Sequence, residues 1–236
     1  MSSDERREAL KHVYREARGC TACPELAAAR TQVVFGAGNA DADLMFVGEA
    51  PGANEDRIGL PFVGQAGKLL DTLLSEIGLE RDDVFVANVL KCRPPGNRDP
   101  HPVEIENCSG YLMRQLDLIE PKVVCTLGNF ATKLLRADMT GITRLHGTPE
   151  VRVIGARAVR LYPLYHPAAA LYTPRMLEVL REDFSRIPAL LDMEPPPQPE
   201  PVAEVAEIAE EAEPEAAPPA GEPELAPQLA PQLGLF

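Results

Sequence analysis

Residues 44–52 have the sequence Leu44-Met-Phe-Val-Gly-Glu-Ala-Pro-Gly52, an apolar run that ends directly in a turn containing glycine and proline. Three further short apolar runs follow along the chain, at residues 84–88, 123–128 and 159–165. Runs of this length, rich in branched side chains and bounded by turn residues, are typical of strands buried on both faces. The sequence therefore predicts four buried strands.

The segments between these strands carry apolar residues at helical spacing. Residues 66–77 place leucine and isoleucine at i, i+3 and i+4, and residues 103–118 and 129–135 show a similar pattern. Strands that alternate with helices predict an α/β fold, here a three-layer α/β/α arrangement around a central, mainly parallel four-stranded sheet. In such sheets ligands bind at the carboxyl ends of the strands.

The composition changes abruptly near Met193. Residues 192–236 contain one Asp, ten Glu and no Lys or Arg, whereas the preceding 191 residues carry 25 acidic and 23 basic side chains. A segment built from Pro, Ala and Glu cannot bury enough apolar surface to offset its ordering entropy. We therefore predict one globular domain at residues 1–191 and a disordered acidic tail at residues 192–236. The nearly neutral domain is compatible with a small basic face.

The chain has no run of 18 or more apolar residues, and its first residues are charged. These features predict neither a membrane span nor a signal peptide, so we expect a cytoplasmic protein. Disulfides are uncommon in that compartment, and the five cysteines need another explanation.

Four of the cysteines form a pattern suited to a metal site. Cys20 and Cys23 form a CxxC pair, and Cys92 and Cys108 follow with 15 residues between them. Four thiolates arranged in this way can hold either an iron–sulfur cluster or zinc, and the spacing alone leaves both open. Cys125 lies within an apolar strand and is expected to be a small buried core residue.

Polar and aromatic side chains fall at the predicted carboxyl ends of the strands. The turn at residues 48–52 can direct backbone N–H groups at a ligand, although an ordinary strand-to-helix turn has the same composition. Phe62 is either a core residue or a stacking platform. Asn88 ends an apolar strand, so its amide must cap a loop or bond a ligand. His166 follows the fourth strand, where a loop role and a functional role are both open.

Taken together, these motifs resemble the family 4 uracil-DNA glycosylases of the uracil-DNA glycosylase superfamily. The resemblance covers about residues 18–185 and rests on the following stretches: Cys20-Thr-Ala-Cys23, Val34-Phe-Gly-Ala-Gly38, Gly48-Glu-Ala-Pro-Gly52 with Glu55-Asp56, Gly59-Leu-Pro-Phe-Val-Gly64, Asn88, Lys91-Cys-Arg-Pro-Pro-Gly-Asn-Arg-Asp-Pro100, Cys108 and His166-Pro-Ala-Ala.

The resemblance implies a hydrolase that cleaves the N-glycosidic bond of uracil in DNA, leaves an abasic site and initiates base excision repair. It implies that Gly48, Glu49 and Ala50 line the uracil pocket. Phe62 would stack on the flipped base, and the Asn88 amide would pair with O4 and N3–H of uracil. His166 would donate to O2 of the departing base. The ligands of a 4Fe-4S iron–sulfur cluster would be Cys20, Cys23, Cys92 and Cys108.

One position departs from other glycosylases of the superfamily. Where they place an aspartate that orients water, this chain has Ala50. Either Glu49 or Glu55 would orient the water instead, or catalysis would rest mainly on stabilisation of the leaving base; the sequence leaves this open. Leu171 or Tyr172 would fill the gap left by the flipped base, with a core role as the alternative. We expect phosphate contacts from the following residues: Lys91, Arg93, Arg98 and Arg175.

The chain ends in Gln232-Leu-Gly-Leu-Phe236, which is similar to the short peptides that dock bacterial repair proteins on the sliding clamp. Gln232, Leu233, Leu235 and Phe236 would make this contact, although a chance apolar terminus is the alternative. The expected partners are thus uracil-containing DNA, single- or double-stranded, and the clamp, for a monomer associated with the nucleoid. A non-catalytic iron–sulfur adaptor that binds DNA and the clamp is the alternative function.

Overall fold

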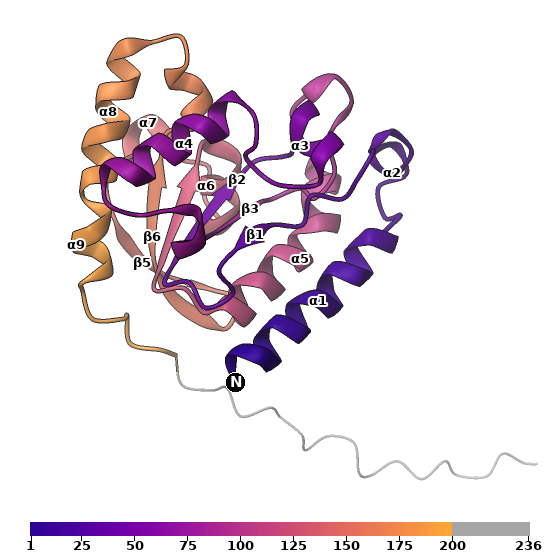
Figure 1. Cartoon of the computed structure of the whole chain (residues 1–236), viewed down its shortest axis with the longest axis horizontal. Coiled ribbons are helices and arrows are strands. Elements are labelled where there is room, and N and C mark those ends of the chain that lie inside the picture. The colour runs from indigo at the N-terminus through magenta and orange to yellow at the C-terminus, as the bar shows by residue number, and fades with distance from the viewer. Residues whose placement is uncertain (200–236) are drawn as a thin grey trace, which may run out of the picture. The chain divides into compact units, whose positions relative to one another are not determined.

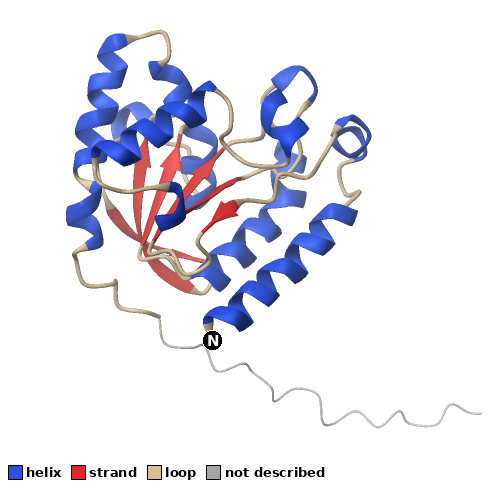
Figure 2. Cartoon of the chain, in the orientation of Figure 1, coloured by secondary structure: helices blue, strands red, loops and turns tan. Residues whose placement is uncertain are grey.

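The computed structural model describes residues 1–199 of the chain, which form a sheet with helices on both faces (Figures 1 and 2). The sheet of this part has six strands in the order β1-β3-β2-β4-β6-β5. The predicted tail beyond residue 199, including the four clamp residues, lies outside the described part. The strands are β1 (Ala37–Gly38), β2 (Leu44–Gly48), β3 (Val84–Asn88), β4 (Val123–Leu127), β5 (Glu150–Ile154) and β6 (Arg157–Leu164).

The four predicted strands form the parallel centre of the sheet, so the predicted fold class is confirmed. β2 pairs in parallel with β3 and with β4, and β4 pairs in parallel with β6. The sequence did not predict the two edge strands, β1 and β5, which pair antiparallel with β3 and β6. β1 is only two residues long, and β5 alternates exposed with less exposed residues because an edge strand needs no continuous apolar run.

Helices cover the two faces of the sheet, and those predicted at residues 66–77, 103–118 and 129–135 are confirmed. The Ser2 side chain caps the first helix, in a capping box with Glu5. The helices are α1 (Ser3–Gly19), α2 (Pro24–Ala29), α3 (Ala53–Ile58), α4 (Gln65–Glu76), α5 (Pro102–Ile119), α6 (Asn129–Arg136), α7 (Ile142–Leu145), α8 (Pro174–Ser185) and α9 (Ile187–Leu191), with short 3-10 turns η1 (Arg81–Asp83), η2 (Pro95–Asn97) and η3 (Pro167–Ala170).

Two hydrophobic cores separate the three layers. Met45 and Val47 of β2 point to the core formed with α1, α5 and α6, whereas Leu44 and Phe46 point to the core formed with α4, α8 and α9. This alternation follows from the two-residue period of a strand, which sends successive side chains to opposite faces. Figure 1 shows α1 and α5 side by side on one face and α4 with α8 on the other. Both faces of the central strands are thus buried, as their continuous apolar runs predicted.

The last described residues pack against the amino end of β6. Arg160 donates to the main-chain oxygens of Leu190 and Glu194 at 3.3 and 3.1 Å, and the Gln198 amide exchanges two hydrogen bonds with the backbone of Ala158. Contacts with the sheet thus continue to Gln198, and the domain boundary at residue 191 stays a prediction. No helix within residues 1–199 is long and apolar enough to cross a membrane.

Candidate active site

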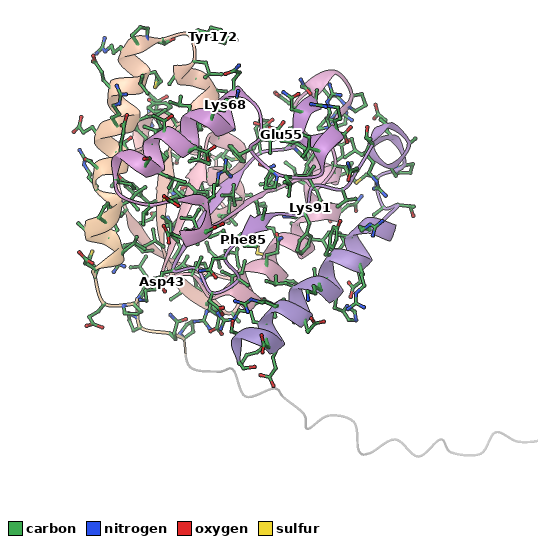
Figure 3. All side chains as sticks on the ribbon, viewed as in Figure 1. Asp43, Glu55, Lys68, Phe85, Lys91 and Tyr172 are labelled. Atoms are coloured by element: carbon green, nitrogen blue, oxygen red, sulfur yellow. The ribbon has the colours of Figure 1, made fainter. Side chains whose placement is uncertain are left out.

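A cavity of about 440 Å³ opens at the carboxyl edge of the parallel strands. It gathers the predicted residues Glu49, Ala50, Glu55, Phe62, Asn88 and His166 from four separate segments. The loop that carries Cys92 forms a further wall through Pro94, Asn97 and Arg98, which the sequence reasoning did not place in the site. Figure 3 shows Glu55 at this edge and Asp43, which precedes β2, at the opposite one.

The side chain of Asn88 is buried in the wall of this cavity without a hydrogen-bond partner. It is 2% exposed, and its Oδ1 atom bonds to no residue of the described chain. Gly48 is its direct neighbour across the sheet. A buried carbonyl oxygen without a partner costs about 1–3 kcal/mol. Oδ1 of Asn88 is therefore available to accept a hydrogen bond from a ligand that enters the cavity.

Gly48 makes the close approach of Asn88 and Phe62 possible. A Cβ atom at Gly48 would lie 2.7 Å from Cζ of Phe62 and closer still to Oδ1 of Asn88. Such contacts require one of the two side chains to move.

We expect Gly48→Ala to lower activity at least about tenfold, because the displaced amide would no longer meet its ligand in the productive geometry. The measurement is the rate of the reaction proposed below under single-turnover conditions. Gly110→Ala in α5 is the matched control, because a Cβ at Gly110 meets no atom within 4 Å. Equal rates for both variants and the wild type would contradict this role of Gly48.

The backbone of Phe62 is held in a left-handed conformation, with φ of 54°. Few non-glycine residues adopt this region, and such strain persists only where the surroundings impose it. Arg81 donates to the main-chain oxygen of Phe62 at 2.8 Å, and a Cβ at Gly67 would overlap the same oxygen. The ring of Phe62 consequently stacks on the imidazole of His166, with centroids 5.6 Å apart.

Glu55 fixes the segment that follows Phe62. Its Oε1 atom accepts hydrogen bonds from the backbone N–H groups of Val63 and Gly64, at 3.0 and 2.8 Å. These groups lie at the start of α4, where a carboxylate is favourable because the helix dipole is positive. The carboxylate of Glu55 therefore stabilises the loop that carries Phe62.

Glu49 is placed differently. Its carboxylate makes no hydrogen bond within the described residues, although it lines the same cavity. Burial, with a smaller contribution from Asp99, raises the pKa of Glu49 to about 6. Both carboxylate oxygens of Glu49 are therefore free for a water molecule, whereas Glu55 uses its Oε1 atom to hold the loop.

The imidazole of His166 has a defined proton arrangement. Its Nδ1 atom accepts a hydrogen bond from the N–H of Ala168 at 3.1 Å, so the neutral ring carries its proton on Nε2. Burial lowers the pKa of His166 to about 4, against a smaller opposing effect of Glu55. At neutral pH the ring is thus an uncharged donor through Nε2.

Tyr172 and Leu171, the two candidates for the wedge, differ in exposure. Tyr172 is 90% exposed, whereas Leu171 is half-buried at the end of η3. Figure 3 shows Tyr172 at the outer end of the loop before α8. The exposure of Tyr172 supports the wedge role more than that of Leu171, and the role itself stays a prediction.

The four basic residues expected to contact phosphates have different surroundings. Lys91 is only 1% exposed, so its ammonium cannot reach a phosphate, contrary to the expectation. Arg98 pairs with Glu25 and Glu104. Arg93 donates to Asn97, and Arg175 is exposed without an ion pair among the described residues.

The predicted ligand cysteines meet at one place, where α1, α2, the loop after β3 and α5 approach each other. The four thiols are half-buried, and Arg30 donates to Sγ of Cys92 while the backbone N–H of Lys91 donates to Sγ of Cys108, both at 3.2 Å. Burial raises the pKa of the Cys108 thiol to about 11, against a smaller opposing effect of Lys91. Cys125 is buried apart from them in the core, as predicted.

The four thiols are suitable donors for either of the two metal alternatives. Among the described residues, no three cysteine sulfurs lie within 4.8 Å of one another. A tetrahedral zinc ion with Zn–S bonds of about 2.3 Å requires sulfurs roughly 3.8 Å apart. An iron–sulfur cluster binds each thiolate to a different iron and so accepts a wider spacing. The four thiols thus fit the donor set of an iron–sulfur cluster.

A second group of possible metal ligands lies close by. Glu25, His101 and Glu104 each place one ligand atom within 4.8 Å of the others. Arg98 donates to both of these carboxylates, so a cation there would compete with the guanidinium. This group is therefore an ion-pair cluster that ties α2 to the start of α5.

Comparison with known proteins gives consistent results. Residues 35–187 match the family model described as the uracil DNA glycosylase superfamily. The chain is 48% identical over 185 residues to a type-4 uracil-DNA glycosylase of Sulfurisphaera tokodaii, covering 76% of this chain and 84% of that protein. It is 45% identical over 193 residues to one of Archaeoglobus fulgidus, covering 80% and 96%. A third, of Thermotoga maritima, is 39% identical over 192 residues, covering 80% and 98%.

Proposed function

The chain belongs to the uracil-DNA glycosylase superfamily, and we propose on that basis that it hydrolyses the N-glycosidic bond of uracil in DNA. The reaction leaves an abasic site and initiates base excision repair. The observation that carries the proposal is the buried, unpartnered Oδ1 atom of Asn88 beside Phe62 and His166. With DNA as its substrate, the protein would act at the nucleoid.

Base recognition follows from the two ends of the Asn88 amide. Its Oδ1 would accept from N3–H of uracil, and its NH₂ group would donate to O4. Cytosine presents the opposite pattern, an acceptor at N3 and a donor at N4. Oδ1 would then face another acceptor and the NH₂ group another donor, so neither hydrogen bond would form. The ring of Phe62, held beside His166, would stack on the base once it has left the DNA duplex.

Cleavage of the glycosidic bond needs a hydrogen-bond donor that stabilises the negative charge on the leaving base. When the C1′–N1 bond breaks, its electron pair leaves with uracil and negative charge develops on O2. His166 would donate to that oxygen through Nε2–H, which its contact with Ala168 leaves free. Water then adds to C1′ and loses a proton, for which the carboxylate of Glu49 is the better-placed acceptor.

The proposed activity is tested by incubating the protein with uracil-containing oligonucleotides, single- and double-stranded, and measuring free uracil and abasic sites. We expect release of uracil from both and none from matched strands that contain cytosine. Release is expected to be faster from the single strand, because extrusion from a duplex costs a few kcal/mol. A folded protein that retains its metal and releases no uracil would favour the adaptor function.

We also propose that Cys20, Cys23, Cys92 and Cys108 hold a 4Fe-4S cluster. Their half-burial and common location support this assignment. When bound, the cluster would supply a structural cross-link between the start of the chain and the loop that lines the cavity. Hydrolysis of the glycosidic bond needs no change of oxidation state.

Removal of a single ligand tests the cluster assignment. We expect Cys92→Ala to lose iron, sulfide and visible absorption, and to unfold at a lower temperature because the cross-link is lost. Cys125→Ala is the matched control: it removes a buried thiol outside the group and should retain the iron. Wild-type protein that contains zinc in place of iron and sulfide would contradict the assignment.

For contacts with DNA we propose Tyr172 as the wedge and Arg175 as a phosphate contact. Both are exposed: Tyr172 lies between η3 and α8, and Arg175 lies in the first turn of α8. An exposed aromatic ring can fill the space that an extruded base leaves in the stack. Arg175 has no ion-pair partner in the described part of the chain, so its charge is available to a phosphate.

We further propose that Gln232, Leu233, Leu235 and Phe236 dock on the sliding clamp. Gln198 bonds to Ala158 at the amino end of β6, whereas the cavity lies at the carboxyl edge of the sheet. The last described residues therefore lie away from the cavity, which leaves the cavity free for DNA.

Deletion of residues 232–236 is expected to abolish binding to the sliding clamp, measured by calorimetry in about the micromolar range. Uracil release from short oligonucleotides should be unchanged, because the cavity lies within the described domain. Leu229→Ala, in the preceding Leu-Ala-Pro-Gln repeat, is the matched control. Retained clamp affinity after the deletion would contradict the proposal.

A further inference from the structure

The buried side-chain amine of Lys91 has no carboxylate partner. No salt bridge to Lys91 occurs within residues 1–199, and its side chain is 1% exposed. Burial lowers the pKa of this amine to about 7, and in either protonation state its N–H groups need hydrogen bonds in place of the lost water. Burial of this lysine costs free energy, and the partners of its Nζ atom show which groups it holds.

The ammonium of Lys91 joins Asn88 to α5. Its Nζ atom donates to the main-chain oxygen of Asn88 at 2.8 Å and to Oε1 of Gln115 at 2.5 Å. The Nε2 atom of Gln115 in turn donates to the main-chain oxygen of Phe35 at 2.9 Å. The aromatic ring of Phe35 lies 5.8 Å from Nζ and offers a favourable cation–π contact.

The backbone of Asn88 is thus fixed from both sides. On one side, Val89 donates to the main-chain oxygen of Gly48 at 2.9 Å and so ties the end of β3 to the turn of the cavity. On the other side Lys91 holds the carbonyl of Asn88 itself. The side chain of Asn88 has no bond of its own to orient it, so its direction depends on this backbone.

The main chain of Lys91 connects the same unit to the cysteine site. Its N–H donates to Sγ of Cys108, its carbonyl accepts from Val34 at 2.8 Å, and the next residue is Cys92. Lys91 therefore lies between the proposed cluster ligands and the residue proposed to read the base.

We propose that Lys91 is a positioning residue that holds Asn88 in the orientation required for base recognition, with Gln115 as its anchor. The inference rests on the proposed function, since it concerns how that site is kept in shape. The loop after β3 then has two roles, because it carries a cluster ligand and also fixes the recognition amide through a buried ammonium group.

A double-mutant cycle separates this role from general support of the core. We expect Lys91→Met to lower kcat/KM for a uracil oligonucleotide about 30-fold in the otherwise wild-type protein, but less than about 3-fold in the Asn88→Ala background. A lysine that only fills the core would lower activity by the same factor in both backgrounds. Equal factors, or full activity of the single variant, would overturn the proposal.

A second readout does not depend on turnover. Free uracil should bind Lys91→Met about tenfold more weakly than wild type in calorimetry, and bind Asn88→Ala and the double variant equally weakly. Lys122→Met is the matched control, because Lys122 is a more exposed lysine paired with Asp43 at the opposite edge of the sheet. Its uracil affinity and iron content should be those of the wild type.

If Lys91→Met does not fold, Gln115→Met replaces it in the same cycle, since it removes the anchor and leaves the ammonium in place. A loss that Asn88→Ala abolishes supports the proposal, and an additive loss overturns it. Wild-type protein without uracil release would instead refute the proposed function, so the two failures are distinguishable.

Discussion

Asn88→Ala is expected to lower the single-turnover rate of uracil release at least about 100-fold, which corresponds to ~3 kcal/mol. The amide is the group proposed to pair with N3–H and O4 of uracil, and its contacts are lost together. The loss should appear in the chemical step as well as in binding, because a base that is not held in register does not place O2 beside His166.

The same substitution should leave the free energy of unfolding unchanged or raise it. Oδ1 of Asn88 has no hydrogen-bond partner among residues 1–199, so alanine removes a desolvated acceptor rather than a bond. Loss of activity with retained stability is therefore the expected signature, measured by uracil release and by chemical denaturation.

Asn129→Ala provides the matched control with the opposite pattern. Its Oδ1 accepts from the N–H of Ile142 at 2.9 Å, so alanine leaves a donor at the start of α7 without its partner. We expect about 1 kcal/mol of lost stability and nearly wild-type activity. Asn88→Ala with activity within tenfold of wild type would show that base recognition lies elsewhere.

The sequence predicted the parts of the site that depend on local pattern. The strand at residues 44–48, the polar end of the strand at residues 84–88 and the position of His166 follow from apolar runs and their ends. Because parallel strands end at the same edge of a sheet, the convergence of these residues was also predictable. The two edge strands were not, since their short or alternating pattern resembles a loop.

The parts that the sequence did not predict depend on contacts between distant segments. Nothing near Phe62 in the sequence indicates a left-handed backbone, which arises because Gly67 and Arg81 approach its carbonyl. In the sequence, Lys91 is a lysine followed by Cys-Arg, and this basic stretch indicated a contact with phosphate. Lys91 is buried because α5 brings Gln115 to within hydrogen-bond distance of its ammonium.

His166→Ala is likewise expected to lower the rate of the chemical step at least about 100-fold, since a lost donor to a developing anion typically costs on the order of 3 kcal/mol. The affinity for free uracil should fall much less, because the neutral base carries little charge on O2. A large effect on the rate with a small effect on binding distinguishes this variant from Asn88→Ala.

The pH dependence of the rate provides an independent test of the same role. Burial lowers the pKa of His166 to about 4, so the ring is already neutral above about pH 5 and its titration should not alter the rate from there to pH 8. Glu49 has a pKa raised to about 6, and as a proton acceptor it must be ionised; activity should therefore rise as the pH increases through about 6.

Variants of the two residues should separate the effect of His166 on the pH dependence of the rate from that of Glu49. His166→Ala should keep the rise near pH 6 at a rate lowered throughout, whereas Glu49→Gln should remove the rise. His146→Ala is the matched control, because its imidazole is bonded to Asp183 at 2.8 Å and lies outside the cavity lining. A rise near pH 6 that disappears in His166→Ala but persists in Glu49→Gln would assign the titration to the imidazole and contradict its role as a neutral donor.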